Sequence, residues 1–226
     1  MLIIPIFPWG KYDVDNLTLI TIWSTILIRM SKMNESILGI LQKGQTISVG
    51  QVLDLGLSRA LLPFYEKQGL LVRVKQGVYM LPSAIEDDLY TLSLRSSKII
   101  FSHETALFLN NLSERTPFKH SVTIPSNFRL SKKTLQQCNC YYIKPTLYKL
   151  GLTQRKTTFG HMVPCYNSER TICDLLRSQS RCDTETLLTA LKNFASNPQK
   201  DINLLVQYAK KLHVFKQLTP YMEVLL

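Results

Sequence analysis

The chain has 226 residues, with 27 Lys and Arg against 16 Asp and Glu, which gives a formal net charge of +11. Apolar residues make up 45% of the sequence; this is enough for packed cores, so disorder is excluded as the main state. Neither a Gly-X-Y period nor sustained heptads occur, which excludes collagen-like and coiled-coil proteins. The positive charge favours an acidic partner: nucleic acid, an anionic membrane surface or an acidic protein.

The first 32 residues differ from the rest of the chain. An apolar run of 12 residues over 17–28 is interrupted by threonines and a serine, whereas a membrane span needs about 20 apolar residues. The segment also lacks the basic start and the cleavage site of a signal peptide. We interpret residues 1–32 as an N-terminal extension or a start-site artefact, with a membrane anchor as the lesser alternative.

The cysteines indicate the compartment. Their odd number, 5, without a secretory context predicts reduced thiols and a cytoplasmic protein. Cys138 and Cys140 stand one residue apart, which misses the C-x-x-C spacing of zinc knuckles, and no pair of histidines lies nearby. We therefore expect no metal site and no cofactor.

Residues 33–82 predict a winged helix-turn-helix domain. Apolar residues at helical spacing, serine caps and terminal glycines predict three helices, over residues 35–42, 49–55 and 59–68. The alternating segment 70–75 and the return strand 78–81 form a hairpin, which is the wing. Such a domain presents its third helix to the major groove of DNA and its wing to the flanking backbone.

Candidate DNA-contacting residues follow from this arrangement. The exposed face of the third helix is predicted to carry Ser58, Arg59, Leu62 and Glu66. The wing contributes Arg73, Lys75 and the backbone around Gly77. Pro63 is expected to bend the helix. The segment 34–80 holds five basic and three acidic residues, so it supplies few phosphate contacts; a protein-binding winged helix stays open as the alternative.

Residues 83–226 predict a larger mixed domain. Short strands are expected over 99–101, 121–124 and 141–143, with a hairpin over 154–166. Ser102 is predicted to cap a helix, and the chain reads as helical from Ser168 onward. Strands followed by a helical run are typical of α+β folds. The whole chain is thus predicted to be α+β, with a winged helix-turn-helix followed by a mixed domain that ends in several helices.

No catalytic motif is found in this second domain. A Walker-type glycine loop and a G-x-S-x-G elbow are absent, and no second histidine follows His103 as zincins require. Arg170 and Asp174, four residues apart, predict an ordinary surface ion pair. The three acids that could in principle assemble a nuclease-like metal site are Glu104, Glu169 and Asp174. We expect a protein that is not an enzyme.

The charge of the second domain is concentrated in one stretch. Between Arg115 and Ser168 there are nine basic residues and no acidic one: Arg115, Lys119, Arg129, Lys132, Lys133, Lys144, Lys149, Arg155 and Lys156. Five aromatic residues are interleaved with them: Phe118, Phe128, Tyr141, Tyr142 and Tyr148. This mixture suits nucleic-acid contact through phosphate pairing and stacking, so a second anion-contacting surface is expected. The alternative is that the aromatics are core residues and the charges a solvated face.

Four segments, in this order, resemble the AbiEi antitoxin family: Arg-Val-Lys-Gln-Gly-Val-Tyr at 73–79, Ser-His-Glu-Thr-Ala-Leu at 102–107, Val-Thr-Ile-Pro at 122–125 and Tyr-Asn-Ser-Glu-Arg-Thr-Ile-Cys-Asp-Leu-Leu at 166–176. The likeness runs from about residue 34 to the C-terminus. Its most specific part is the Glu-Arg-Thr-Ile-x-Asp run placed after His-Glu-Thr-Ala-Leu. The resemblance implies the antitoxin of a bacterial type IV toxin–antitoxin system, which acts in abortive infection and phage resistance.

The resemblance also implies roles for the two domains. The winged helix would bind inverted repeats in its own promoter and repress the operon, and residues 83–226 would counteract a nucleotidyltransferase-like toxin without requiring a stable complex. The matching positions are His103, Glu104, Thr105, Glu169, Arg170 and Asp174; whether they act directly or hold the fold stays open. The alternative function is a transcription factor whose second domain senses a ligand or partner and which has no toxin.

Overall fold

The computed structural model describes residues 33–44 and 46–225. The interpretation of residues 1–32 therefore lies outside the described residues. The chain divides into two compact units, Met1–Ala84 and Ile85–Leu226, here called unit 1 and unit 2. Within the described ranges, no helix combines the length and the apolar character that a membrane span requires.

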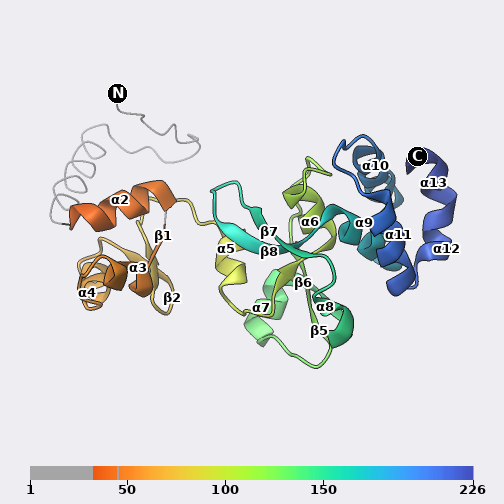
Figure 1. Cartoon of the computed structure of the whole chain (residues 1–226). Coiled ribbons are helices and arrows are strands. Elements are labelled where there is room, and N and C mark those ends of the chain that lie inside the picture. The colour runs from red at the N-terminus through yellow and green to blue at the C-terminus, as the bar shows by residue number, and fades with distance from the viewer. Residues whose placement is uncertain (1–32, 45, 226) are drawn as a thin grey trace, which may run out of the picture. The chain divides into compact units, whose positions relative to one another are not determined.

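Unit 1 contains three helices and a three-stranded antiparallel sheet in the described ranges (Figure 1). Its elements are α2 (Glu35–Gly44), β1 (Thr46–Ser48), α3 (Val49–Asp54), α4 (Leu61–Lys67), β2 (Val72–Lys75) and β3 (Val78–Met80). The strand order is β1-β3-β2. The second helix begins as predicted, because Ser48 and Gln51 form a reciprocal capping box. The three-residue strand β1 was not predicted, since so short a segment shows no alternation.

The third helix starts later than predicted, at Leu61 rather than Arg59. Pro63 explains the difference. It is the third residue of α4 and so lies in the first turn, where backbone N–H groups have no hydrogen-bond acceptor within the helix. A start at Arg59 would place Pro63 where an N–H donor is needed. The Ser58 hydroxyl instead accepts a hydrogen bond from the Ala60 N–H, at 3.3 Å, in the connection before the helix.

The hairpin of β2 and β3 forms as predicted, with a turn at Gly77, which has a φ of +76°. Leu71 is 2% exposed, whereas Val72 is 48% exposed. The reason is local: after α4, the N–H groups of Leu70 and Leu71 both donate to the carbonyl of Tyr65. This turn brings Leu71 into the core before the strand begins.

Unit 2 is built on a five-stranded mixed sheet with the order β6-β5-β4-β8-β7. The strands are β4 (Ile100–Phe101), β5 (His120–Pro125), β6 (Cys138–Ile143), β7 (Leu152–Lys156) and β8 (Met162–Tyr166). Outer strands β6 and β7 form the two edges. The predicted hairpin is confirmed as the antiparallel pair β7–β8. Together with the helices, this sheet confirms the α+β fold class.

The helices of unit 2 precede, connect and follow the strands. They are α5 (Asp88–Ser93), α6 (His103–Leu109), α7 (Lys132–Gln137), α8 (Pro145–Tyr148), α9 (Ser168–Arg177), α10 (Thr184–Ala195), α11 (Ile202–Lys211), α12 (Phe215–Leu218) and α13 (Met222–Leu225), with 3₁₀ turns η1 (Gln179–Arg181) and η2 (Thr219–Tyr221). Helices α7 and α8 were not predicted. Both are too short to show an amphipathic period.

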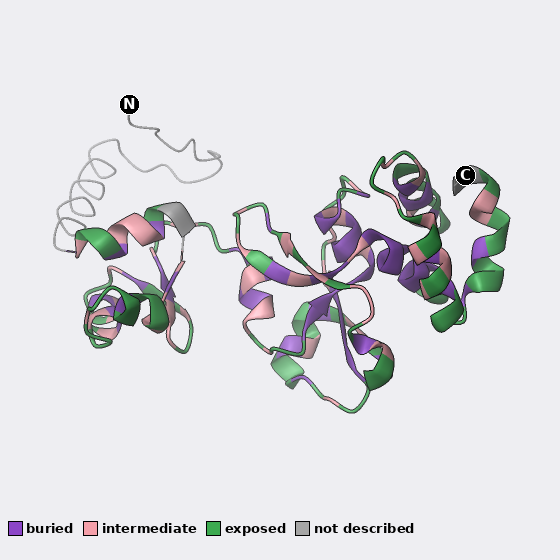
Figure 2. Cartoon of the chain, viewed as in Figure 1, coloured by how far each residue is buried: buried purple, intermediate pink, exposed green. Residues whose placement is uncertain are grey.

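Two apolar cores cover the faces of this sheet. Ile100 points into a core shared with α9, α10 and α11, whereas its neighbour Phe101 points into a core shared with α5 and α6. Figure 2 shows α9 buried along most of its length. All its residues from Ser168 to Leu176 are buried, polar ones included. The polar side chains of α9 must therefore find partners inside the protein.

Candidate functional site

The structure revises the candidate DNA-contacting residues of α4. Ser58 and Arg59 are exposed in the connection before the helix. The prediction that Leu62 lies on the exposed face is wrong: its side chain is 0% exposed and packs in the core of unit 1. Leu62 and Tyr65, three residues apart, share the buried face of α4.

Two other candidates contact each other. Nη2 of Arg73 donates a hydrogen bond to Oε2 of Glu66, at 2.7 Å. The guanidinium carbon of Arg73 also lies 5.4 Å from the ring centroid of Tyr79. The hydrogen bond to Glu66 raises the pKa of Arg73. Its charge is thus already partly neutralised within unit 1.

The turn of the β2–β3 hairpin is anchored to α3. The carbonyl of Gly77 accepts a hydrogen bond from the N–H of Val49, at 2.9 Å. Lys75 is exposed on β2, and Lys67 is exposed at the end of α4. The exposed basic side chains of the α4 region and the β2–β3 hairpin are Arg59, Lys67, Arg73 and Lys75.

The nine basic residues of the acid-free stretch are divided over unit 2. Four belong to α7, edge strand β6 and the segments next to them: Arg129, Lys132, Lys133 and Lys144. Two lie on β7, the opposite edge: Arg155 and Lys156. Three lie in connections: Arg115, Lys119 and Lys149. The stretch is thus distributed between both edges of the sheet.

The interleaved aromatic residues also divide. Phe118 is fully exposed and Tyr142 is 38% exposed, with the guanidinium of Arg129 over its ring. Tyr148 is buried, and its hydroxyl donates to the carbonyl of Lys98. The alternative that the interleaved aromatics are core residues is therefore right for Tyr148 and wrong for Phe118.

The prediction of a surface ion pair between Arg170 and Asp174 is wrong, because the pair is buried. The two side chains are 0% and 4% exposed, and Nε of Arg170 donates to Oδ1 of Asp174 at 3.0 Å. Nη1 of Arg170 donates to the carbonyls of Leu147 and Leu150, and its guanidinium carbon lies 4.3 Å from the ring centroid of Tyr166. Spacing alone could not distinguish this arrangement from an exposed helical pair.

Three other residues at positions that match the AbiEi family form hydrogen bonds with the backbone and with neighbouring side chains. The hydroxyl of Thr105 accepts from the N–H of Ser121, whose hydroxyl donates to Oε2 of Glu104. Oε1 of Glu169 accepts from the N–H of Asp201, at 3.3 Å. Among the described residues, no three His, Cys, Asp or Glu side chains come together as a metal site. The structure therefore does not assemble Glu104, Glu169 and Asp174 into a nuclease-like centre.

His103 is the strained member of this group. It opens α6 with a φ of +50°, a left-handed conformation that is uncommon outside glycine and clusters at functional sites. Its ring stacks on Tyr141, with centroids 3.5 Å apart. Nδ1 forms a hydrogen bond with the hydroxyl of Ser102, and Nε2 with that of Ser178. Ser102 therefore begins the helix as predicted but does not cap it with its side chain.

Burial keeps this imidazole neutral. Loss of solvent lowers the pKa of His103 to about 3, and the charges of Arg177, Arg170 and Arg181 act in the same direction. The hydroxyl of Thr123 donates to Ser102 at 2.8 Å, which extends the hydrogen-bonded chain from Ser178 through His103 to β5.

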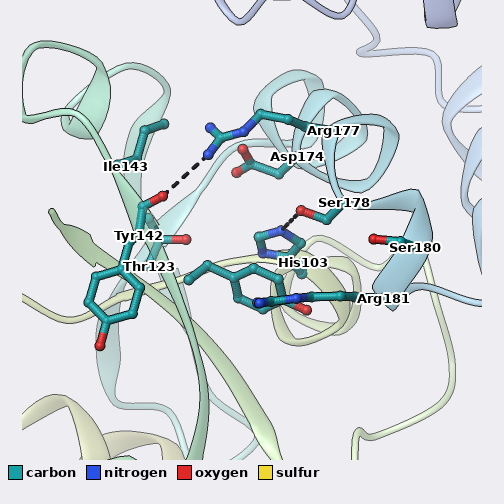
Figure 3. Close-up of a pocket in the computed structure, with 10 residues that line it drawn as sticks. His103, Thr123, Tyr142, Ile143, Asp174, Arg177, Ser178, Ser180 and Arg181 are labelled. Carbon is teal, nitrogen blue, oxygen red and sulfur yellow. Dashed lines mark hydrogen bonds between the residues drawn. The ribbon is translucent and has the colours of Figure 1, made fainter.

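A pocket of about 300 Å³ opens beside His103 (Figure 3). We call it the Arg177 pocket; its lining residues are His103, Thr123, Tyr141, Tyr142, Ile143, Asp174, Arg177, Ser178, Ser180 and Arg181. Figure 3 shows the carboxylate of Asp174 pointing into the space between Arg177 and His103. Arg177 donates to the carbonyl of Tyr142 at 3.2 Å, and the guanidinium of Arg181 lies 5.3 Å from the ring centroid of Tyr141.

Sequence reasoning missed the two arginines of this pocket. Arg177 and Arg181 lie at the end of α9 and in η1, outside the acid-free stretch, and their four-residue spacing carries no signal of its own. Tyr141 was identified only as one of the interleaved aromatic residues. The parallel pairing of β5 and β6, which places Thr123 opposite Tyr141, brings these distant segments together.

Neither a protein-family model nor a curated protein matches the chain. Among solved structures, the RV2827C protein from Mycobacterium tuberculosis is similar, with a TM-score of 0.47 and 13% sequence identity. The likeness covers 89% of this chain and 80% of that one. At this level, it assigns no function to either unit.

Proposed function

We propose that the chain is the antitoxin of a type IV toxin–antitoxin system and represses its own operon by binding double-stranded DNA. The observation that carries the DNA-binding part is the order of elements in unit 1. Helices α3 and α4 are joined by a glycine-containing connection, and the hairpin β2–β3 follows directly. A winged helix-turn-helix uses these parts to bind DNA, with the second helix of the pair in the major groove.

Exposed basic side chains support this use of unit 1. Arg59 precedes α4 and Lys67 ends it, while Lys75 lies on the wing. Phosphate pairing by such residues positions a protein on the duplex. Leu62 is removed from the candidate contacts because it lies in the core, and Glu66 because it neutralises Arg73. We assign Arg59 and Lys75 as the principal contacts.

The antitoxin role belongs to unit 2 and rests on the order of motifs that resemble the AbiEi family. In this proposal, the protein acts in the cytoplasm against a nucleotidyltransferase-like toxin. Thr105, Glu169 and Arg170 are buried and hydrogen-bonded within unit 2, which favours a role for these residues in holding the fold. A transcription factor that senses a ligand is the second candidate function, and the Arg177 pocket is the observation that favours it.

A mobility-shift assay on the DNA upstream of the gene tests the DNA-binding part. We expect Arg59→Ala and Lys75→Ala each to weaken binding and to lower the salt slope by about 1. Arg95→Ala is the matched control, because Arg95 is exposed in unit 2. Equal binding by all four proteins would contradict the assignment.

Co-expression with the neighbouring gene tests the antitoxin part. We expect the full chain to restore growth if that gene encodes the toxin. The double variant Arg59→Ala/Lys75→Ala should restore growth equally well while losing repression of a promoter reporter. Failure of the wild-type chain to restore growth, with repression intact, would favour the ligand-sensing transcription factor.

A further inference from the structure

The Arg177 pocket contains a buried acceptor without a partner. Asp174 is 3% exposed, and its Oδ1 accepts from Arg170. In the described part of the chain, its Oδ2 has no hydrogen-bond partner, and neither has Nη2 of the paired Arg170. An unsatisfied buried acceptor costs free energy unless a donor arrives from outside. Since Asp174 lines the pocket and its carboxylate points into it (Figure 3), a bound molecule could supply that donor.

The mouth of the same pocket carries two guanidinium groups. Arg177 and Arg181 are both exposed, and no carboxylate in the described ranges lies within salt-bridge distance of either. The hydrogen bond to Tyr142 uses one N–H of Arg177 and leaves others for a ligand. Ser178 and Ser180 add hydroxyl groups to the lining, of which that of Ser178 is hydrogen-bonded to His103.

Other charges near the pocket leave it positive. Arg170 is paired with Asp174, and His103 is neutral near pH 7 because its pKa lies at about 3. Glu104 and Asp183 are the acids on the Cys182 side. Neither lines the pocket, and their carboxylates accept hydrogen bonds from Ser121 and Thr186. Two guanidiniums with adjacent hydroxyls match the several acceptor oxygens of a phosphate group.

The arginine side chains are also held in place before a ligand binds. The guanidinium of Arg181 lies over the ring of Tyr141, which stacks on His103. The hydrogen bonds of His103 to Ser102 and Ser178 fix that ring in turn. His103, whose backbone has a left-handed φ, is itself a lining residue of the pocket. Preorganised donors lose less entropy on binding.

We propose that the Arg177 pocket binds a small phosphomonoester that also carries a hydroxyl or amino group. The phosphate lies between Arg177 and Arg181, and the hydroxyl or amino group donates to Oδ2 of Asp174. A volume of about 300 Å³ is at the lower end for small-molecule sites, which restricts the ligand to the size of a sugar phosphate or a nucleoside monophosphate. This inference concerns unit 2 alone and does not require that unit 1 binds DNA.

Isothermal titration calorimetry on the full chain tests the proposal. The probes are ribose 5-phosphate, AMP, inorganic phosphate and ribose. We expect one or both phosphomonoesters to bind at least about tenfold more tightly than inorganic phosphate, because only they reach Asp174 with a donor. Ribose should not bind. Tighter binding of AMP indicates a nucleotide as the source of the phosphate, and tighter binding of ribose 5-phosphate a sugar phosphate.

Variants locate the binding site. Arg177→Gln and Arg181→Gln should each weaken phosphomonoester binding at least about tenfold, since each removes a charge-assisted hydrogen bond. Arg129→Gln is the matched control, because Arg129 is also exposed and lies over a tyrosine ring of β6 but does not line the pocket. If Arg177→Gln disturbs folding, the result for Arg181→Gln tests the proposal, since the side chain of Arg181 makes no hydrogen bond in the described structure.

Three results would overturn the proposal. They are the absence of phosphomonoester binding, equal affinity for inorganic phosphate and both esters, and an equal loss of affinity in Arg129→Gln. A separate mobility-shift measurement on the same preparations reports on DNA binding. Failure of the ligand proposal and failure of the DNA-binding proposal are therefore distinguishable.

Discussion

Glu66 and Arg73 form an ion pair that joins helix α4 to strand β2, with Oε2 and Nη2 2.7 Å apart. The two side chains are 33% and 46% exposed, so solvent screens the pair and its contribution to stability is small. Its larger effect is on charge. In a unit that would approach DNA phosphates, Glu66 neutralises an arginine of the wing and adds repulsion of its own.

Removing this carboxylate should strengthen DNA binding. We expect Glu66→Gln to raise the affinity for promoter DNA several-fold and to increase the salt slope by about 1, because Arg73 becomes available for a phosphate. A mobility-shift titration at several salt concentrations measures both. Glu35→Gln controls for net charge, since Glu35 is an exposed acid at the start of α2. An equal gain in that control would show that the pairing with Arg73 is irrelevant.

The buried pair in α9 should behave differently from an exposed pair. Asp174→Ala leaves the charge of Arg170 buried without its partner, so we expect the free energy of unfolding to fall by about 3–5 kcal/mol. Arg115→Ala breaks the exposed contact with Glu185, whose nitrogen and oxygen atoms are 3.6 Å apart, and should cost less than about 1 kcal/mol. Chemical denaturation followed by circular dichroism measures both. Similar losses in the two variants would contradict the burial of the α9 pair.

Acid should destabilise unit 2 through His103. Because folding lowers the pKa of this imidazole from 6.5 to about 3, the unfolded chain binds more protons between these values. The contribution of the neutral His103 to the free energy of unfolding is complete above the pKa of the unfolded chain. Below that pKa it falls by about 1.4 kcal/mol per pH unit. We expect a loss of about 2 kcal/mol between pH values of roughly 6.5 and 5.

His103→Asn isolates this effect, because asparagine tolerates a positive φ and does not titrate. Burial raises the pKa of Asp174, which acts in the opposite direction, but this carboxyl is present in both proteins. The comparison is the free energy of unfolding of each protein as a function of pH. Parallel curves for the variant and the wild type would show that His103 is not buried in its neutral form.

Gly151 should be irreplaceable for a steric reason. It has a φ of +74°, and a Cβ there would lie 2.6 Å from Cβ of Arg170 and 2.8 Å from Oδ1 of Asn167, the N-cap of α9. We expect Gly151→Ala to lower the free energy of unfolding by about 3 kcal/mol or more, from backbone strain and overpacking together.

Gly160 provides the matched control. Its φ is +87°, but nothing lies within 4 Å of an added Cβ, so Gly160→Ala should cost only about 1 kcal/mol of backbone strain. Thermal or chemical denaturation of both variants measures the difference. Equal costs would mean that the close approach of Gly151 to α9 does not contribute.

Local chemistry made some elements predictable. The capping residue Ser48, the turn at Gly77 and the β7–β8 hairpin each depend on neighbours within a few positions, and each was located from the sequence. The start of α4 was not, although Pro63 carried the information, because the serine at position 58 offered a competing cap. The burial of Leu71 was not predictable either, since it depends on the turn after α4, which brings Leu71 into the core.

By itself, the sequence determined the α+β class, the position of the hairpins and the uneven distribution of charge, because these follow from local periodicity and composition. Only the tertiary structure decided which polar residues are buried. Helix spacing places Arg170 and Asp174 side by side whether the pair is exposed or buried. The packing of α9 between the sheet and α11 removes both side chains from water. The Arg177 pocket also depends on tertiary structure, because the parallel pairing of β5 with β6 and the end of α9 bring together residues from four separate segments of the chain.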